Sequence, residues 1–201
     1  MQIKTELQLR ELYGFPKGRS KEKILSGLEK HAIHFIETSP FLVMSTCNSE
    51  SKLDASPRGG TPGFVKVTSN TEIVIPDAKG NNIVDSISNI VETGMVGLLF
   101  LIPGVDETLR VNGHASISTD AEYLELFTSE RMLPKACIVI TIEEVFLHCA
   151  KAFMRSKLWD EASKIDRNSF PTMGQMLKDQ LRSDEDPESR EDMIERYKKD
   201  L

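Results

Sequence analysis

The sequence lacks the features that typify secreted, membrane-spanning and nucleic-acid-binding proteins. Its three cysteines form no CxxC pair, and their odd number excludes a complete disulfide framework, so we expect reduced, mostly buried thiols. No apolar run approaches the ~20 residues of a membrane span, and the N-terminus has no signal-peptide core, which predicts a cytoplasmic chain. The net charge of −6 argues against general binding to nucleic acid.

Familiar catalytic motifs are missing as well. The sequence contains no GxSxG, no HExxH, no Walker lysine loop and no GxGxxG after a strand. His31 and His34 lie three residues apart, but no Cys/His cluster accompanies them, so we expect no metal site. This pattern leaves open both a cofactor-dependent enzyme and a protein without catalysis.

The composition, 39% hydrophobic and 28% charged, is typical of a globular chain with one substantial core. The N-terminal third predicts a helix that Ser20 could cap and Pro40 ends. Its apolar face carries Ile24, Leu28, Ala32 and Phe35.

Short apolar or alternating segments then predict strands. They are FLVMSTC, LDASP, FVKV, EIVIP, VGLLFLIP, LRVNGHASIS and ACIVITIEEVFL. Helices are expected at about residues 82–92 and 120–127, which favours a mainly β protein with flanking helices, built as a closed or partly closed antiparallel barrel. From Ser183 onward the chain is mostly charged, which predicts a solvated or partner-packed helix starting near Pro187, or a disordered tail.

The stretch DASPRGGTPGF, residues 54–64, is the first that could bind a ligand. Its prolines and glycines predict a tight turn between strands, where small residues let a ligand approach the backbone. Arg58 then provides a planar cation suited to phosphate or to an electron-rich carbonyl edge. A glycine- and proline-rich hairpin with an exposed arginine is the alternative.

Two further stretches carry polar groups in a suggestive order. In IPDAKGNNIVDSI a strand ends, Lys79 follows, and Asn81 and Asn82 begin a helix whose free amides could bind phosphate; an ordinary capped helix would look similar. In FLIPGVDETLRVNGHASIS a hairpin places Thr108 and Arg110, with Asn112, on one face, where a heterocycle could satisfy them. A solvent-facing strand would need no such partner.

The stretch HCAKAFMRSKLWD, residues 148–160, holds the only tryptophan beside a run of Lys and Arg. It could be a solvated helix, a partner surface or one wall of an anionic-ligand site.

Taken in order, DASPRGG, IPDAKGNN, PGVDETLRVNGHA and HCAKAFMRSKLWD resemble the pyridoxamine 5′-phosphate oxidase-related flavoproteins over about residues 37–160. Within that superfamily they resemble a branch of FMN-dependent enzymes. The resemblance implies a split β-barrel of Greek-key type that works as a homodimer, with two FMN molecules held at the interface by both chains. FMN would accept electrons and the protein would orient it, so no catalytic side chain is assigned.

Carried over by position, the resemblance assigns roles to nine residues. Arg58 would contact the flavin or its ribityl phosphate, and Thr108 and Arg110 would lie beside the isoalloxazine ring. Phosphate would be held by Lys79, Asn81 and Asn82. The last motif would contribute Arg155, Ser156 and Trp159 from the other subunit.

We therefore expect an N-terminal helical segment (1–36), a split-barrel FMN-binding domain (37–160) and a charged, helical C-terminal extension (161–201). The expected function is an FMN-dependent oxidoreductase with a small, unidentified substrate. Vitamin B6 oxidation is not expected, because true pyridoxamine phosphate oxidases end in a short basic segment and this chain continues into an acidic one. The alternatives are a non-catalytic flavin-binding or sensing protein, or a barrel that uses haem or a deazaflavin.

Overall fold

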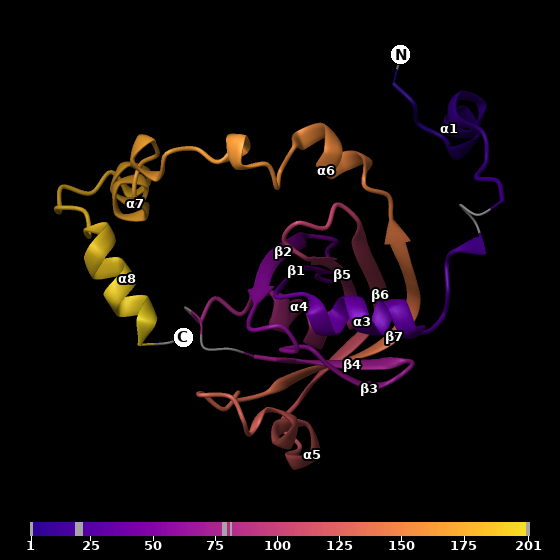
Figure 1. Ribbon diagram of the computed structural model, residues 1–201, viewed down its shortest axis with the longest axis horizontal. Helices are drawn as coiled ribbons and strands as arrows, with labels where there is room; N and C mark the ends of the chain where they lie inside the picture. Colours follow the sequence, from indigo (N-terminus) through magenta and orange to yellow (C-terminus); the bar gives the residue numbers. More distant parts are fainter. Residues whose placement is uncertain (1, 19–21, 78–79, 81, 200–201) are drawn as a thin grey trace.

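The protein folds around one antiparallel seven-stranded sheet with the strand order β2-β1-β5-β6-β7-β4-β3. The structure, a computed structural model, describes residues 2–18, 22–77, 80 and 82–199. The sheet curls into a split β-barrel (Figure 1). Its strands are β1 (Phe41–Cys47), β2 (Leu53–Gly59), β3 (Lys66–Ser69), β4 (Glu72–Pro76), β5 (Met95–Leu101), β6 (Thr108–Ser118) and β7 (Cys137–His148).

Each predicted strand segment forms a strand at nearly the predicted place, so the fold-class prediction is confirmed. Along β1, β5 and most of β6, buried side chains alternate with more exposed ones, because successive side chains of a strand point to opposite faces. We call the face that packs on the main core the inner face and its opposite the outer face.

Helix α3 (Lys30–Thr38) fills the open side of the curl and buries Ala32, Phe35 and Ile36 against the inner face. It ends before Pro40, as predicted. The predicted start was wrong, because the helix begins only after Glu29, whose carboxylate accepts the amides of its first turn. The preceding residues are drawn into a bridge between Leu25 and Val145, which requires extended backbone; Ser20 lies outside the described residues.

The stretch predicted as a turn at residues 54–64 begins instead as β2. Pro57 is tolerated there because β2 is the edge of the sheet and β1 is its only partner. Asp54 accepts hydrogen bonds from Ser56 in the same strand and from buried Ser86 in α4 (Asp85–Thr93). The polar residues of this motif therefore tie the edge strand to α4.

A second, smaller core lies on the other side of β4 and β7. The predicted helix at residues 120–127 appears as α5 (Ala121–Leu124) followed by a 3₁₀ turn, η1 (Glu125–Phe127), and Phe127 packs there on Cys137. Burial raises the pKa of the Cys137 thiol. All three thiols are free, but only Cys137 is buried, since Cys47 is half-buried and Cys149 is exposed, so the expectation of mostly buried cysteines was wrong.

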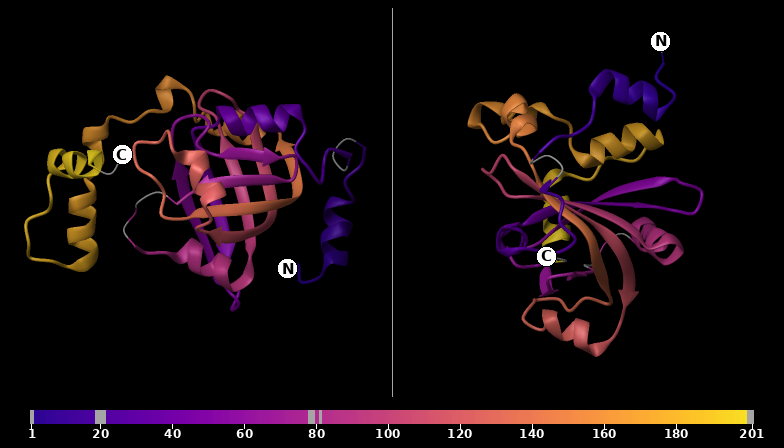
Figure 2. Two further views of the ribbon diagram at one scale, coloured as in Figure 1. Left: turned by 90° about the horizontal axis from the view of Figure 1, so that it is seen from below. Right: turned by 90° about the vertical axis from the view of Figure 1, so that its right-hand side faces the viewer.

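The terminal segments extend from the barrel. Figures 1 and 2 show α1 (Glu6–Tyr13), α7 (Met173–Leu181) and α8 (Arg190–Lys198) standing away from the sheet, while α6 (Lys151–Ser156) lies near one end of it. Two 3₁₀ turns, η2 (Glu161–Ser163) and η3 (Arg167–Ser169), connect α6 to α7. Helix α8 begins at its Ser189 cap, so the predicted tail helix is confirmed. Among the described residues, no helix is long and apolar enough to cross a membrane.

We expect the substitution Gly113→Ala to destabilise the fold. Gly113 lies at the β-bulge between β6 and β7, and a Cβ there would overlap the Thr141 carbonyl, which is backbone and cannot rotate away. Overpacking of this kind costs about 1–3 kcal/mol. The free energy of unfolding, measured with urea, should fall by that amount, whereas Gly80→Ala, which meets open space, should change it little. Equal effects of the two substitutions would contradict this reading of the bulge.

Candidate functional site

A polar strip crosses the outer face where β6 and β7 pair. Cross-strand neighbours in this strip are Thr108 with His148, Arg110 with Phe146, and Asn112 with Glu144. The β6 residues between them, Leu109 and Val111, are fully buried in the core, so the predicted division of β6 into two faces is confirmed.

Glu144 links two polar side chains of the strip through hydrogen bonds. Its Oε1 accepts hydrogen bonds from Arg110 Nη2 at 3.1 Å and from Asn112 Nδ2 at 3.0 Å. Arg110 Nε, by contrast, is buried and has no hydrogen-bond partner in the described part of the chain. A buried donor without an acceptor is costly, so an acceptor supplied by a ligand would stabilise this atom. Glu144 was not predicted as a site residue, because no sequence pattern marks it.

Three basic side chains surround Phe146. Arg110 Cζ lies 4.2 Å and Lys23 Nζ 5.0 Å from the centre of the Phe146 ring, and the His148 ring centre lies 4.8 Å from it. We call these four residues the Phe146 cluster. Burial lowers the pKa of His148, and the positive charges of Arg110 and Lys23 lower it further.

Beside the strip the outer face is hollowed into an open groove of about 440 Å³. Gly97 helps to keep this space open, because a Cβ at that position would lie 3.2 Å from Asn112 Oδ1. The groove is within the size range of ligand sites, about 300–1,000 Å³. Its lining includes Ser45, Leu53, Met95, Gly97, Asn112 and Glu144.

Arg58 does not join this strip within one chain. It pairs with Leu42, and that row of the sheet continues through Phe100 and Leu109 on the inner face, one residue out of phase with Arg110. Its Nη1 donates to the Pro57 carbonyl at 2.9 Å. Burial lowers the pKa of Arg58, while nearby Asp77 and Asp54 raise it.

The predicted phosphate loop can be described only in part. Asn82 is exposed, with φ = 63°, and α4 starts three residues later, at Asp85, without a side-chain cap. The expectation that the asparagines begin the helix was therefore wrong for Asn82, because its left-handed backbone cannot continue into a helical turn. Lys79 and Asn81 lie outside the described residues.

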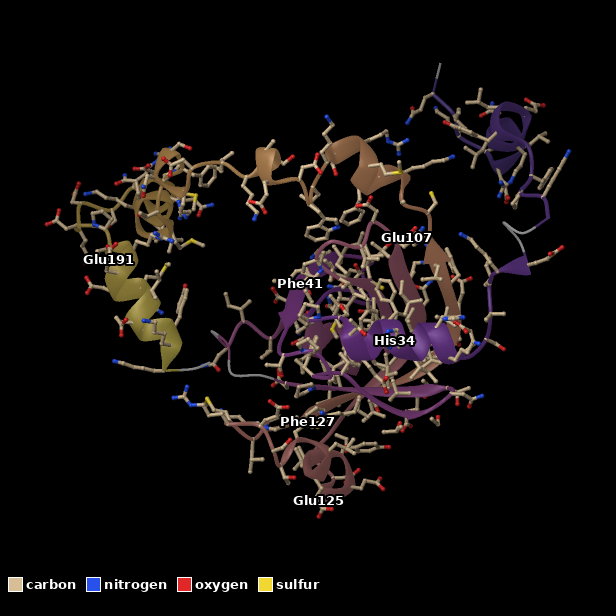
Figure 3. The ribbon with its side chains drawn as sticks, viewed as in Figure 1. His34, Phe41, Glu107, Glu125, Phe127 and Glu191 are labelled. Carbon is tan, nitrogen blue, oxygen red and sulfur yellow. The ribbon has the colours of Figure 1, made fainter. Side chains whose placement is uncertain are left out.

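Trp159 binds the last motif to a loop of the barrel. Its indole Nε1 donates to the Val105 carbonyl in the β5–β6 loop at 3.0 Å, and its ring stacks on Phe153 with 5.4 Å between centres. Figure 3 shows Glu107 of the same loop on the side of the barrel that carries α6. Arg155 and Ser156 are exposed on α6. In its own chain, the tryptophan therefore positions α6 at the end of the sheet where β6 begins.

The sequence profile of pyridoxamine 5′-phosphate oxidase matches residues 28–149, more than half of the chain. The protein belongs to the pyridoxamine 5′-phosphate oxidase family. The match runs from just before α3 to just after β7, so it includes the polar strip and leaves out Lys23 and α6. No curated protein matches the sequence.

Several solved structures are similar to this family member at low sequence identity. HupZ from Group A Streptococcus superposes with a TM-score of 0.50 and 14% identity over 60% of this chain and 93% of its own. An FMN-binding protein from Syntrophomonas wolfei has a TM-score of 0.43 and 12% identity, over 72% of this chain and 97% of its own. An FAD-binding protein from Mycobacterium smegmatis has a TM-score of 0.44 and 12% identity, over 62% of this chain and 97% of its own.

The lowered pKa of His148 predicts a pH dependence of stability. The unfolded chain takes up a proton as the pH falls through the ordinary histidine pKa of 6.5, whereas the folded chain takes it up only at lower pH. The folded state therefore loses stability in this window. In urea unfolding at pH 7.5 and pH 5.5, His148→Gln should lose less stability on acidification than the parent, and the exposed-site control His34→Gln should behave like the parent. The same acid loss in all three proteins would contradict this prediction.

Proposed function

We propose that this family member is an FMN-dependent oxidoreductase that acts on a small molecule. The observation that carries the proposal is the unpartnered, buried Nε of Arg110, whose ion-pair partner Glu144 lines an open groove on the outer face. A flavin fits these residues because its ring edge offers carbonyl and nitrogen acceptors to Arg110 and Asn112. When bound, the flavin would supply the electron-accepting chemistry that no side-chain motif of this chain provides.

The proposed site divides the roles among several segments. Thr108 and Arg110 lie along the ring, where a positive charge favours the negative charge that develops on a reduced flavin. Arg58, with Lys79 and the two asparagines, holds the phosphate. Since Arg58 and Arg110 project from opposite faces of one sheet, these groups meet around one cofactor only if two chains contribute.

A homodimer is accordingly part of the proposal. Large apolar side chains remain exposed on the outer face, with Phe41 at 38%, Met95 at 47% and Leu53 at 85% of full exposure. Exposed apolar surface of this kind is typical of protein–protein contacts. Exposed Arg155 and Ser156 of one chain, carried by α6, would reach the cofactor of the other, and Trp159 would hold α6 in place. The barrel domain would span residues 37–160, flanked by segments 1–36 and 161–201.

A non-catalytic flavin-binding or sensing role is the second candidate. It is favoured by α7, on which Met173, Leu177 and Leu181 are exposed although large and apolar. Such a helix could dock a partner protein that responds to the flavin. Turnover of a substrate with reduction of the bound flavin would distinguish the first candidate from the second.

We expect the purified protein to bind FMN with a flavin absorption spectrum and to prefer FMN over riboflavin. Replacing Arg110 by Ala should weaken FMN about ten- to a hundredfold, because it removes one charge-assisted hydrogen bond. Replacing exposed Arg190 on α8, which loses the same charge, should have an effect of less than about twofold. Equal affinity for FMN and riboflavin, or an Arg110 variant that binds FMN like the parent, would overturn the site assignment.

Mixing two variants, each with weakened FMN binding, tests the shared site. If Arg110 acts from one chain and Arg155 from the other, a dimer of Arg110→Ala and Arg155→Ala chains contains one intact site and one doubly altered site. Random mixing should then restore FMN binding at about a quarter of the sites. No restoration, or sedimentation of the FMN-bound protein as a monomer, would show that each chain binds its cofactor alone. Because Trp159 is the only tryptophan, quenching of its emission by FMN, combined with weaker FMN binding by Arg155→Ala, would indicate FMN bound near α6.

A further inference from the structure

We propose that Lys23, Arg110 and His148 form an oxyanion-binding site around Phe146, which holds a carboxylate or phosphate group of the substrate. The assignment of this anion to a substrate rests on the proposed function. The site itself rests on the geometry of the Phe146 cluster.

The cluster concentrates basic groups at one place on an acidic protein. Lys23 and Arg110 both lie within cation–π distance of the Phe146 ring, at 5.0 and 4.2 Å, and the His148 ring packs on it at 4.8 Å. The whole chain has a net charge of −6, so this arrangement is not a general property of its surface.

The charges of the cluster are incompletely balanced. In the described part of the chain its one ion pair joins Arg110 to Glu144 at 3.1 Å, and that carboxylate is shared with Asn112. Glu29 lines the same pocket as Lys23, but its carboxylate accepts the backbone amides at the start of α3. Lys23 and Arg110 together carry two permanent positive charges, which also disfavour protonation of His148. An added anion would relieve this repulsion.

Hydrogen-bond donors remain for such an anion. The Lys23 ammonium has three N–H groups and donates one to the Leu147 carbonyl at 2.7 Å, which leaves two. Arg110 has five N–H groups, of which one on Nη2 serves Glu144, so its guanidinium keeps donors for an anion besides the Nε–H that is proposed to face the flavin. An oxyanion accepts several hydrogen bonds at once and therefore matches this set of donors.

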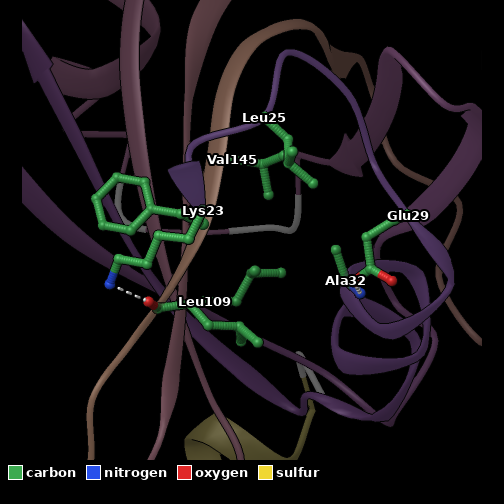
Figure 4. Close-up of a pocket in the computed structure, with 8 residues that line it drawn as sticks. Lys23, Leu25, Glu29, Ala32, Leu109 and Val145 are labelled. Carbon is green, nitrogen blue, oxygen red and sulfur yellow. Dashed lines mark hydrogen bonds between the residues drawn. The ribbon is translucent and has the colours of Figure 1, made fainter. Parts of the chain in front are cut away.

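The chain holds Lys23 in place with backbone contacts. Leu25 exchanges two backbone hydrogen bonds with Val145, at 3.0 and 2.8 Å, so the segment before α3 is fixed against β7. Figure 4 shows Lys23 and Leu25 on this segment, with Val145 and Leu109 contributed by the sheet. Lys23 lies outside the residues that match the family profile, so membership of the family does not imply its role.

The position of the cluster favours a substrate over the flavin phosphate. Arg110 belongs both to the cluster and to the strip along which the flavin ring is proposed to lie, whereas the proposed phosphate residues are on other segments. Electron transfer requires the reacting group of a substrate to lie close to the ring. An anion held between Lys23 and Arg110 would anchor a substrate next to that ring.

Titration of the flavin-free protein with inorganic phosphate, and separately with acetate, tests the site. At constant ionic strength, the imidazole NMR signal of His148, identified through His148→Asn, should shift saturably with at least one of the two anions. Lys23→Ala should raise the dissociation constant about tenfold or more, Lys23→Arg should retain most of the affinity, and Lys17→Ala should change it less than about twofold. Whichever anion binds more tightly identifies the group that the site selects.

Several results would overturn the proposal. If the His148 signal shifts without saturating, or if Lys23→Ala and Lys17→Ala lose equal anion affinity, the effect is general charge attraction and not a site. FMN titrations of the same variants separate this proposal from the proposed function. If Lys23→Ala weakens FMN as much as phosphate, the cluster holds the cofactor and not a substrate. If FMN does not bind but the anion still binds through Lys23, the proposed flavin function fails and the anion site stands.

Discussion

β6 and β7 pair from Thr108–His148 to Ser118–Cys137, and a bulge at Asn112–Gly113 shifts the register within that pairing. The polar strip depends on this shift. On β7 both Ile142 and Val145 are buried although they are three residues apart, which strict alternation would not allow. The extra residue turns Glu144 to the outer face, where it accepts hydrogen bonds from the polar side chains of β6.

The same bulge restricts which residue the fold tolerates at position 113 and leaves a polar group of the site without an acceptor. Gly113 is needed where the two backbones approach, and the carboxylate that the bulge exposes can satisfy only part of the Arg110 guanidinium. A guanidinium without all its partners weakens the folded state, and a ligand that supplies the missing acceptor recovers that energy on binding. The flavin and the oxyanion of the two proposals would approach Arg110 from neighbouring parts of the outer face.

The segments outside the barrel act on the site in two different ways. The segment before α3 brings Lys23 to the end of β7 through backbone pairing at Leu25, and the segment after β7 returns α6 to the β5–β6 loop through Trp159. Both contacts are made near the end of the sheet where β6 begins. Helices α7 and α8 stand apart from that end, so their exposed apolar residues are available to another protein surface (Figure 2).

The sequence by itself determined the strands, the end of α3 and the two faces of β6. These features depend on alternating hydrophobicity and on Pro40, which act over a few neighbouring residues. The same local reasoning failed where pairing overrides propensity. Pro57 and Gly59 suggested a turn, but pairing with β1 keeps them in a strand. The apolar pattern at Ile24 and Leu28 suggested a helix, but Leu25 pairs with Val145 of β7.

Only the tertiary structure decided which residues surround Arg110. Glu144 lies 34 residues from Arg110 in the sequence, and Lys23 lies 124 residues from the Leu147 carbonyl to which it donates. No local pattern encodes such contacts, because a one-residue bulge or a single bridge between distant strands determines whether the side chains meet. The family motifs include Arg110 itself, whereas the acceptor and the second cation beside it arise from the register of the folded sheet.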